Sequence, residues 1–147
     1  MPRIERSAEV VWEGNVARGS GTLTADTGAF SGLPFTLASR IASPEGKTSP
    51  EELLAAAHAG CFTMSLASEL VKAGTPPGRL DVRVKIVMDE VEGQGHQIVG
   101  SEVLVRTELD GVDDAGLEAA IAAADEGCPF SALLKRAGTT VAISRAT

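Results

Sequence analysis

The stretch TSPEELLAAAHAGCFTMSLASELVK, residues 48–72, decides the fold because it carries the start and the body of one long helix. Ser49 can cap this helix, Pro50 fits its first position, and the two acids that follow favour the positive end of the helix dipole. Gly74, with two prolines close behind it, predicts that the helix ends near Lys72.

The middle of this helix is apolar on nearly every side, which indicates a central helix that is covered all round. Residues 53–68 carry no Lys, Arg, Asp or Glu. Ala, Gly, Ser and Thr dilute the stretch, which falls short of the roughly 18 apolar residues typical of a transmembrane helix. We therefore expect a buried helix and no membrane span.

Strands and shorter helices are expected on both sides of the long helix. Before it, the pattern predicts strands at residues 4–12, 22–24 and 35–41. After it, the pattern predicts a strand at 80–86, a turn at 93–95, a return strand at 98–109, helices at 115–126 and 129–136, and a strand at 139–143. This order predicts an α+β fold, with antiparallel sheets packed around the central helix in one domain spanning residues 1–147.

Composition excludes several classes of function. The chain of 147 residues has a formal net charge of −7 and only 3% aromatic residues, without tyrosine. An acidic chain repels nucleic-acid phosphates and anionic membranes, and it lacks the rings on which single-stranded bases stack. The charged N-terminus leads into no apolar segment, so we expect a cytoplasmic protein. Two cysteines without a CxxC motif or a histidine cluster do not make a typical zinc site.

Cys128 lies between Gly127, which should end one helix, and Pro129, which should begin the next. A thiol at that N-cap faces free backbone N–H groups and the positive end of the helix dipole, both of which stabilise the thiolate. The same position also suits a cysteine that only caps the helix or packs as a small apolar group. The sequence favours neither interpretation.

Cys61 lies in the middle of the apolar helix, where a buried and inert cysteine is the simpler expectation. Burial raises the pKa of a thiol, so a reactive Cys61 needs a nearby cation. No Lys or Arg occurs between Lys47 and Lys72, and the candidates are Arg40 and Arg18. His58, one turn before Cys61, is expected to be a core histidine with a backbone partner and no catalytic role.

Two motifs give the chain a family resemblance. Residues 48–62, with the sequence TSPEELLAAAHAGCF, resemble the helix motif of the OsmC/Ohr family. Residues 127–131, with the sequence GCPFS, resemble its second motif, a Cys-Pro that opens a short helix. Trp12–Glu13–Gly14 and the loop at 18–21 also resemble the OsmC branch. The resemblance covers essentially the whole chain, in order.

This resemblance implies a thiol peroxidase for organic hydroperoxides and hydrogen peroxide. Cys61 matches the peroxidatic cysteine and Cys128 the resolving cysteine, which together would form a disulfide. Arg40 and Glu51 match the charged pair that activates the site, although the organic hydroperoxide branch takes its arginine from a position nearer Arg18. A dithiol reductant would restore both thiols, and the organic hydroperoxide branch suggests a lipoyl-bearing protein. The chemistry requires no metal and no organic cofactor.

The spacing of Glu51 and Cys61 predicts an oligomer. Ten residues of one helix separate them, which is about 15 Å along a straight axis. If both serve one site, one of them must come from a partner subunit. We therefore expect an intertwined homodimer with two shared sites, as the family resemblance also implies.

Two other functions fit the sequence. The protein could be a non-catalytic redox-sensing or hydrophobic-ligand-binding dimer, whose cysteines only record oxidation. It could also be a structural dimer with inert buried thiols. Loss of Arg40 or Glu51 would abolish turnover in an enzyme and hardly affect a passive binder.

Overall fold

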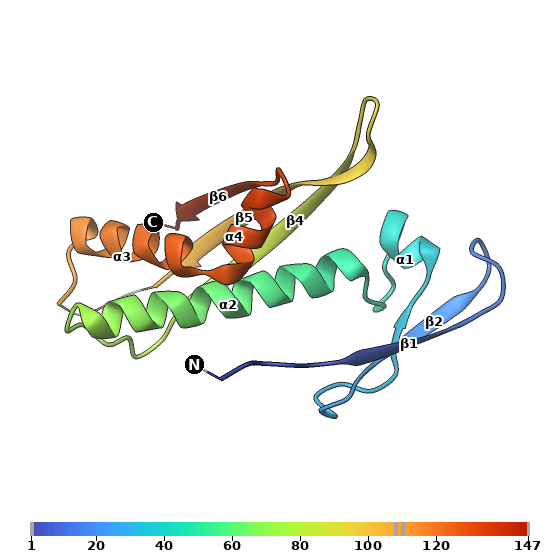
Figure 1. Cartoon of the computed structure of the whole chain (residues 1–147), viewed down its shortest axis with the longest axis horizontal. Coiled ribbons are helices and arrows are strands. Elements are labelled where there is room, and N and C mark those ends of the chain that lie inside the picture. Colours follow the sequence, from blue (N-terminus) through green and yellow to red (C-terminus); the bar gives the residue numbers. More distant parts are fainter. Residues whose placement is uncertain (1, 108, 110, 147) are drawn as a thin grey trace. The chain divides into compact units, whose positions relative to one another are not determined.

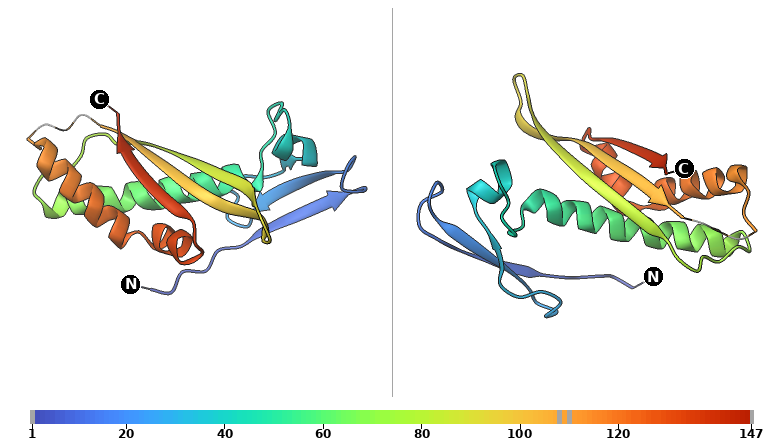
Figure 2. Two further views of the ribbon diagram at one scale, coloured as in Figure 1. Left: turned by 90° about the horizontal axis from the view of Figure 1, so that it is seen from above. Right: turned by 180° about the vertical axis from the view of Figure 1, so that it is seen from behind.

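The computed structural model describes residues 2–107, 109 and 111–146. Its internal contacts fall into two compact units, residues 1–53 and residues 54–147, which are described one at a time. Figure 1 shows the elements of both units, and Figure 2 shows them from two further directions.

The first unit contains a three-stranded antiparallel sheet in the order β1-β2-β3. Its elements are β1 (Ala8–Glu13), β2 (Ser20–Ala25), β3 (Leu33–Phe35) and the short helix α1 (Leu37–Ile41). Gly21 in β2 pairs with both Trp12 and Phe35, whose ring centroids are 5.4 Å apart. A Cβ at Gly21 would lie 2.4 Å from the Phe35 ring, so glycine is required for this aromatic contact.

The prediction of a strand at residues 35–41 is wrong. The strand ends at Phe35, and residues 37–41 form α1. Thr36 caps α1 by accepting a hydrogen bond from the Ser39 backbone N–H, while the Ser39 hydroxyl accepts one from the Thr36 N–H. This reciprocal capping box satisfies two backbone donors and favours a helical turn over an extended chain.

The second unit packs helices against a second three-stranded sheet. The elements of this unit are α2 (Pro50–Lys72), whose first turn belongs to the first unit, β4 (Asp81–Val91), β5 (Gly95–Arg106), α3 (Asp114–Gly127), α4 (Pro129–Arg136) and β6 (Thr140–Arg145). The predicted long helix, the hairpin turn and the helices after it are confirmed, with small shifts at their ends. The return strand predicted for 98–109 runs over 95–106 instead, and residue 108 lies outside the described part of the chain.

This second sheet is mixed rather than antiparallel. Strand β4 pairs antiparallel with β5, but β6 pairs parallel with β5, from Gly100–Thr140 to Val105–Arg145. The final strand comes after two helices, and a helical crossover is what allows a parallel pairing. The expectation of purely antiparallel sheets is therefore wrong for β6.

The core of the second unit lies between α2, α3 and one face of β5. Phe62, Leu66 and Leu70 of α2 are fully buried, and they pack with residues of β5 and α3. The other members of this core are Val103, Val105, Leu117, Ala120, Ile121, Ala124 and Cys128. Replacing one of the large side chains by alanine should cost about 2–5 kcal/mol of unfolding free energy.

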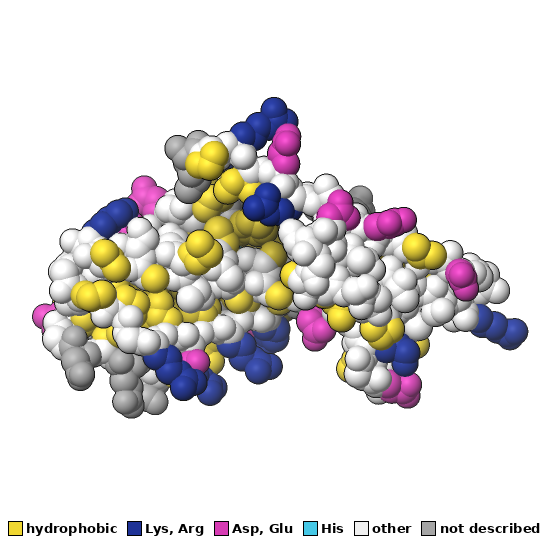
Figure 3. Space-filling model, turned by 90° about the horizontal axis from the view of Figure 1, so that it is seen from below, with side chains coloured by type: hydrophobic (Ala, Val, Ile, Leu, Met, Phe, Trp, Pro, Cys, Tyr) yellow, Lys and Arg dark blue, Asp and Glu magenta, His cyan; other side chains and the backbone are white. Residues whose placement is uncertain are grey.

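Within one chain, α2 is covered on one side only, and not all round as its composition predicts. Its buried stripe repeats every four residues, at His58, Phe62, Leu66 and Leu70. The opposite stripe is exposed and runs through Ala56, Gly60 and Met64, with Met64 76% exposed. Figure 3 shows hydrophobic side chains gathered at the surface of the chain.

By length and composition, α2 could cross a membrane, since an 18-residue window of it has a mean hydropathy of 1.2. The fully buried His58 argues for a core helix instead, because both of its ring nitrogens have hydrogen-bond partners in the second unit. The core helices of water-soluble proteins meet the same length and hydropathy criteria.

Candidate active site

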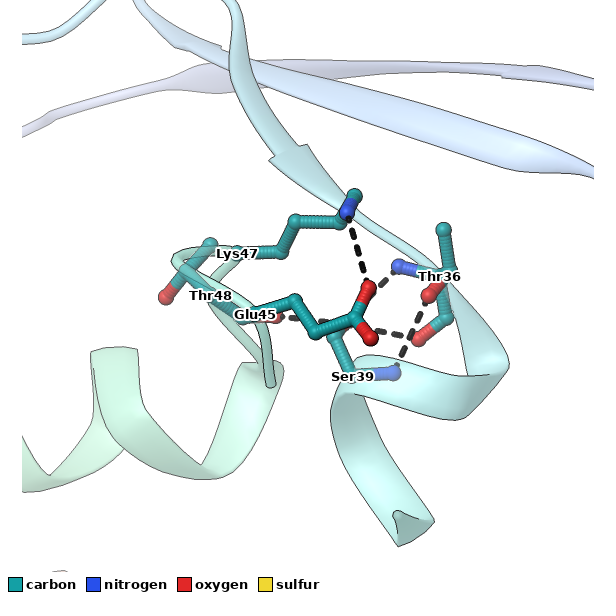
Figure 4. Close-up of polar contacts among 5 residues, drawn as sticks. All are labelled: Thr36, Ser39, Glu45, Lys47 and Thr48. Carbon is teal, nitrogen blue, oxygen red and sulfur yellow. Dashed lines mark hydrogen bonds and ion pairs between the residues drawn. The ribbon is translucent and has the colours of Figure 1, made fainter. Parts of the chain in front are cut away.

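Helix α1 and the loop after it place Arg40. The Ser39 hydroxyl lies 2.8 Å from the carbonyl oxygen of Thr48 and 3.0 Å from that of Thr36, and it can donate to either. Figure 4 shows how these contacts hold α1 against the chain that enters α2, with Lys47 and Glu45 at the edge of the loop. The residue after Ser39 is Arg40, so its backbone is fixed close to the start of α2.

Arg40 and Glu51 form an ion pair in the first unit, as the family resemblance implies. The Nε and Nη2 atoms of Arg40 lie 2.7 and 2.6 Å from Oε1 of Glu51. Burial acts to raise the pKa of Glu51. The hydrogen bond from Arg40, a backbone hydrogen bond, the charge of Arg40 and a hydrogen bond with Ser49 together outweigh burial, so this pKa lies below its ordinary value. Glu51 is therefore ionised at neutral pH and orients the guanidinium group.

An apolar recess of about 320 Å³ opens beside Arg40. The rings of Trp12 and Phe35 line it, together with Val16, Leu37 and Pro50. Thr36 and Arg40 complete its lining. A recess with apolar walls and one cationic group suits a small molecule with a hydrocarbon part and a polar end.

In the second unit, Cys128 is the N-cap of α4, as predicted. Its backbone is extended, Pro129 occupies the first helical position, and the Ser131 backbone N–H donates to the Cys128 sulfur at 3.5 Å. The side chain is fully buried. The cap explains why Gly127, Cys128 and Pro129 occur together: one helix ends and the next begins within three residues.

Cys61 lies at the same end of α4. The backbone N–H of Phe130 and the thiol of Cys128 both lie close enough to the Cys61 sulfur to act on its pKa. Burial raises the pKa of the Cys61 thiol, the Phe130 N–H lowers it, and the contact with Cys128 raises it further, so the net shift is upward. Both thiols are free in this structure.

The structure thus brings the four predicted site residues together as two pairs. Arg40 pairs with Glu51 in the first unit, and Cys61 pairs with Cys128 in the second. Arg18 is exposed in the turn after β1, where its backbone N–H donates to Asn15. Among the described residues, no group of three His, Cys, Asp or Glu side chains is placed to hold a metal ion.

His58 is a core histidine, as predicted, but its partners are side chains rather than backbone groups. Its Nδ1 lies 2.6 Å from the Ser101 hydroxyl and its Nε2 lies 2.8 Å from the Ser131 hydroxyl. Ser131 lies at the end of the second motif, where the resemblance assigns it no role, and Ser101 lies outside both motifs. The position of His58 on the buried face of a helix does indicate that its ring needs hydrogen-bond partners, but it does not identify them.

A family model described as OsmC-like protein matches residues 43–144. Peroxiredoxin OsmC of Escherichia coli strain K12 is 33% identical over 132 residues, which cover 90% of this chain and 91% of that protein. The chain belongs to the OsmC-like family. An organic hydroperoxide resistance protein-like protein of Mycoplasma pneumoniae is also 33% identical, over 98 residues that cover 64% of this chain and 65% of that protein.

Solved structures show that the fold of this OsmC-like chain is that of the family. The organic hydroperoxide resistance protein OhrB of Bacillus subtilis matches with a TM-score of 0.75 at 24% identity, covering 95% of this chain and 98% of that one. An OsmC-like protein of unknown function from Vibrio cholerae matches with a TM-score of 0.79 at 16% identity, covering 98% and 100%. The family resemblance inferred from the two motifs is confirmed.

Proposed function

We propose that this OsmC-like protein is a cysteine-based thiol peroxidase that reduces organic hydroperoxides and hydrogen peroxide. Cys61 is the peroxidatic cysteine and Cys128 the resolving cysteine, with Arg40 and Glu51 as the activating pair. The observation that carries the proposal is the proximity of the two free thiols, Cys61 and Cys128, at the N-terminus of α4. The homology to peroxiredoxin OsmC supports it.

The chemistry follows from this arrangement. The Cys61 thiolate attacks the distal oxygen of the hydroperoxide, so that an S–O bond forms, the O–O bond breaks and an alcohol or water leaves after protonation. The Cys128 thiolate then attacks the sulfenic sulfur of Cys61, so that an S–S bond forms and water leaves. A dithiol, for which a lipoyl-bearing protein is one candidate, returns both cysteines to thiols.

Cys61 needs a cation for the first step, because its surroundings in one chain raise its pKa. A guanidinium near the sulfur favours the thiolate and stabilises the charge that develops on the leaving oxygen. Glu51 and Cys61 are ten residues apart on α2, about 15 Å of helix rise. We therefore propose that Arg40 and Glu51 of one subunit serve Cys61 of its partner in an intertwined homodimer.

Two features of the chain support this dimer. The exposed stripe of α2 through Ala56, Gly60 and Met64 is the apolar surface that a second subunit would cover. The apolar recess beside Arg40 would then hold the hydrocarbon part of an organic hydroperoxide next to its guanidinium.

We further propose that the whole chain acts as one OsmC-like domain of a soluble, cytoplasmic protein. Light scattering coupled to size-exclusion chromatography tests the dimer, and a stable monomer with full activity would contradict it.

The function itself is tested by counting free thiols before and after one equivalent of tert-butyl hydroperoxide. Wild type should lose both thiols within seconds and yield the alcohol. Cys61→Ser should keep its thiol, and Cys128→Ser should accumulate a sulfenic acid that a dimedone probe traps. Two unreacted thiols in wild type after minutes would overturn the proposal and favour a non-catalytic ligand-binding dimer.

A further inference from the structure

His58 is a fully buried ionisable group that the proposed reaction does not use. It is fully buried, as are both of its partners, Ser101 in β5 and Ser131 in α4. Burying a polar side chain costs free energy unless its hydrogen bonds are made, and removing one partner leaves the other unsatisfied. The three side chains therefore hold one another in a fixed arrangement.

The contact between His58 and Ser131 lies one helical turn from each of the two cysteines. His58 lies one turn before Cys61 on α2, and Ser131 lies one turn after Cys128 on α4. The 2.8 Å contact between His58 Nε2 and the Ser131 hydroxyl therefore joins the same two helices as the two thiols do. In addition, the Ser131 backbone N–H donates to the sulfur of the N-cap residue, Cys128.

Disulfide formation changes the groups around Cys128. The S–S bond is about 2.05 Å long and needs a specific torsion, so the Cys128 sulfur must move toward Cys61. A sulfur that moves in this way weakens its contact with the Ser131 N–H, which at 3.5 Å is already long. The contact between Ser131 and His58 involves a different atom of Ser131, the hydroxyl, and does not depend on the position of the Cys128 sulfur.

We propose that the hydrogen bond between His58 and Ser131 positions Cys128 for its attack on the sulfenic acid of Cys61. The proposal rests on the proposed peroxidase function and concerns its second step. His58 transfers no proton and touches neither sulfur in this account. It holds the first turn of α4 against α2, so that the two sulfurs stay within bonding reach while the N-cap rearranges. Misplacement of a reacting group by about 1 Å can cost a hundredfold in rate.

The neutral form of His58 matches its two partners. Burial lowers the pKa of His58, the nearby Asp125 carboxylate raises it, and the charge of Lys135 lowers it, with a net downward shift. Neutral imidazole has one donor and one acceptor nitrogen. Each serine hydroxyl can take the complementary role, so both ring nitrogens are satisfied.

Two substitutions separate the two hydrogen bonds of His58. A glutamine amide nitrogen lies about where Nε2 lies, whereas an asparagine amide nitrogen lies about where Nδ1 lies. His58→Gln therefore keeps the contact with Ser131, and His58→Asn keeps only the contact with Ser101. Ser131→Ala removes the same contact from the other side with almost no change in volume. Ser65→Ala is the matched control, because the Ser65 hydroxyl joins α2 to α3 through the Ala124 carbonyl at 2.9 Å.

The experiment measures the two chemical steps separately after one equivalent of tert-butyl hydroperoxide. Sulfenic acid formation is followed with a dimedone probe in the Cys128→Ser background, and disulfide formation is followed by rapid quenching and mass spectrometry. His58→Asn and Ser131→Ala should form the disulfide about tenfold more slowly, as loss of a buried hydrogen bond implies. They should also accumulate sulfinic acid under excess peroxide. Their sulfenic acid formation should match that of the Cys128→Ser parent.

His58→Gln and Ser65→Ala should form the disulfide at the wild-type rate. The inference is overturned if folded Ser131→Ala forms the disulfide as fast as wild type, or if Ser65→Ala slows it equally. Ser131→Ala keeps this comparison available where a His58 variant does not fold. A wild-type protein that does not react with peroxide would instead refute the proposed function, so the two failures are distinguishable.

Discussion

Two nitrogens of Arg40 contact a single oxygen of Glu51, Oε1, at 2.7 and 2.6 Å. The contact fixes the orientation of a guanidinium group that is 40% exposed in the single chain. The pair thus holds a guanidinium group at the edge of the apolar recess. The first two predictions concern this pair.

Replacing Arg40 by methionine should slow the reaction of Cys61 with hydroperoxide. An opposite charge close to a thiol lowers its pKa by about 1–3 units, so its loss should reduce the rate at neutral pH by about tenfold or more. The measurement is the rate of thiol loss against pH, and the pH profile of Arg40→Met should shift upward. Arg18→Met is the control, and a collapse of activity in that variant alone would assign the activating role to Arg18.

The ion pair should stabilise the protein only above a limiting pH. The pKa of Glu51 in the folded chain lies below its ordinary value of 4.5, so the folded state binds fewer protons than the unfolded state. This stabilisation is present above that ordinary value and is lost as pH falls through the lower, folded pKa. Because Arg40 is partly exposed, the contribution should stay below about 1 kcal/mol.

Urea unfolding of wild type and Glu51→Gln at several pH values measures this contribution. The difference in unfolding free energy between the two proteins should be largest at neutral pH and should shrink in acid. A difference that grows as the pH falls would contradict the lowered pKa.

Gly60→Ala should stabilise the protein. Gly60 lies on the exposed stripe of α2, and no atom lies within 4 Å of the position that a Cβ would take. Alanine gains up to about 1 kcal/mol over glycine inside a helix. Thermal unfolding at a protein concentration low enough to favour single chains should show a higher Tm, because the added Cβ meets no atom of its own chain. A lower Tm would show that another subunit packs directly on the Gly60 backbone.

Met64→Glu should separate the subunits of the proposed dimer. The Met64 side chain is 76% exposed in one chain, so a charge there costs an isolated chain little. A charge buried without a partner at an interface is strongly unfavourable. Light scattering should give the mass of one chain, with loss of peroxidase activity. Ala122→Glu, which adds the same charge to the exposed face of α3, should remain a dimer and stay active.

Sequence patterns predicted the elements whose signals are local. Ser49 and Pro50 predicted the start of α2, and the Glu52 backbone N–H does donate to the Ser49 hydroxyl. Gly127, Cys128 and Pro129 likewise predicted the N-cap of α4. In both cases the residues that decide the structure lie within one turn of the helix end, so the sequence alone contains the whole signal.

Features that depend on distant partners could not be predicted. The parallel pairing of β6 with β5 depends on how two helices cross between them, and no residue of β6 specifies its direction. The partners of His58 lie 43 and 73 residues away in the sequence. Helix α1 was missed for another reason: its capping box uses Ser39 in the place where Glu or Gln is the usual signal.

In the proposed dimer, the two sides of α2 make folding and association parts of one equilibrium. One side of the helix completes the core of its own chain, and the opposite side, through Ala56, Gly60 and Met64, is exposed in the single chain and would be covered by the partner. By mass action, such a dimer gains stability as its concentration rises. A higher concentration of the protein would therefore give not only more copies but more stable ones.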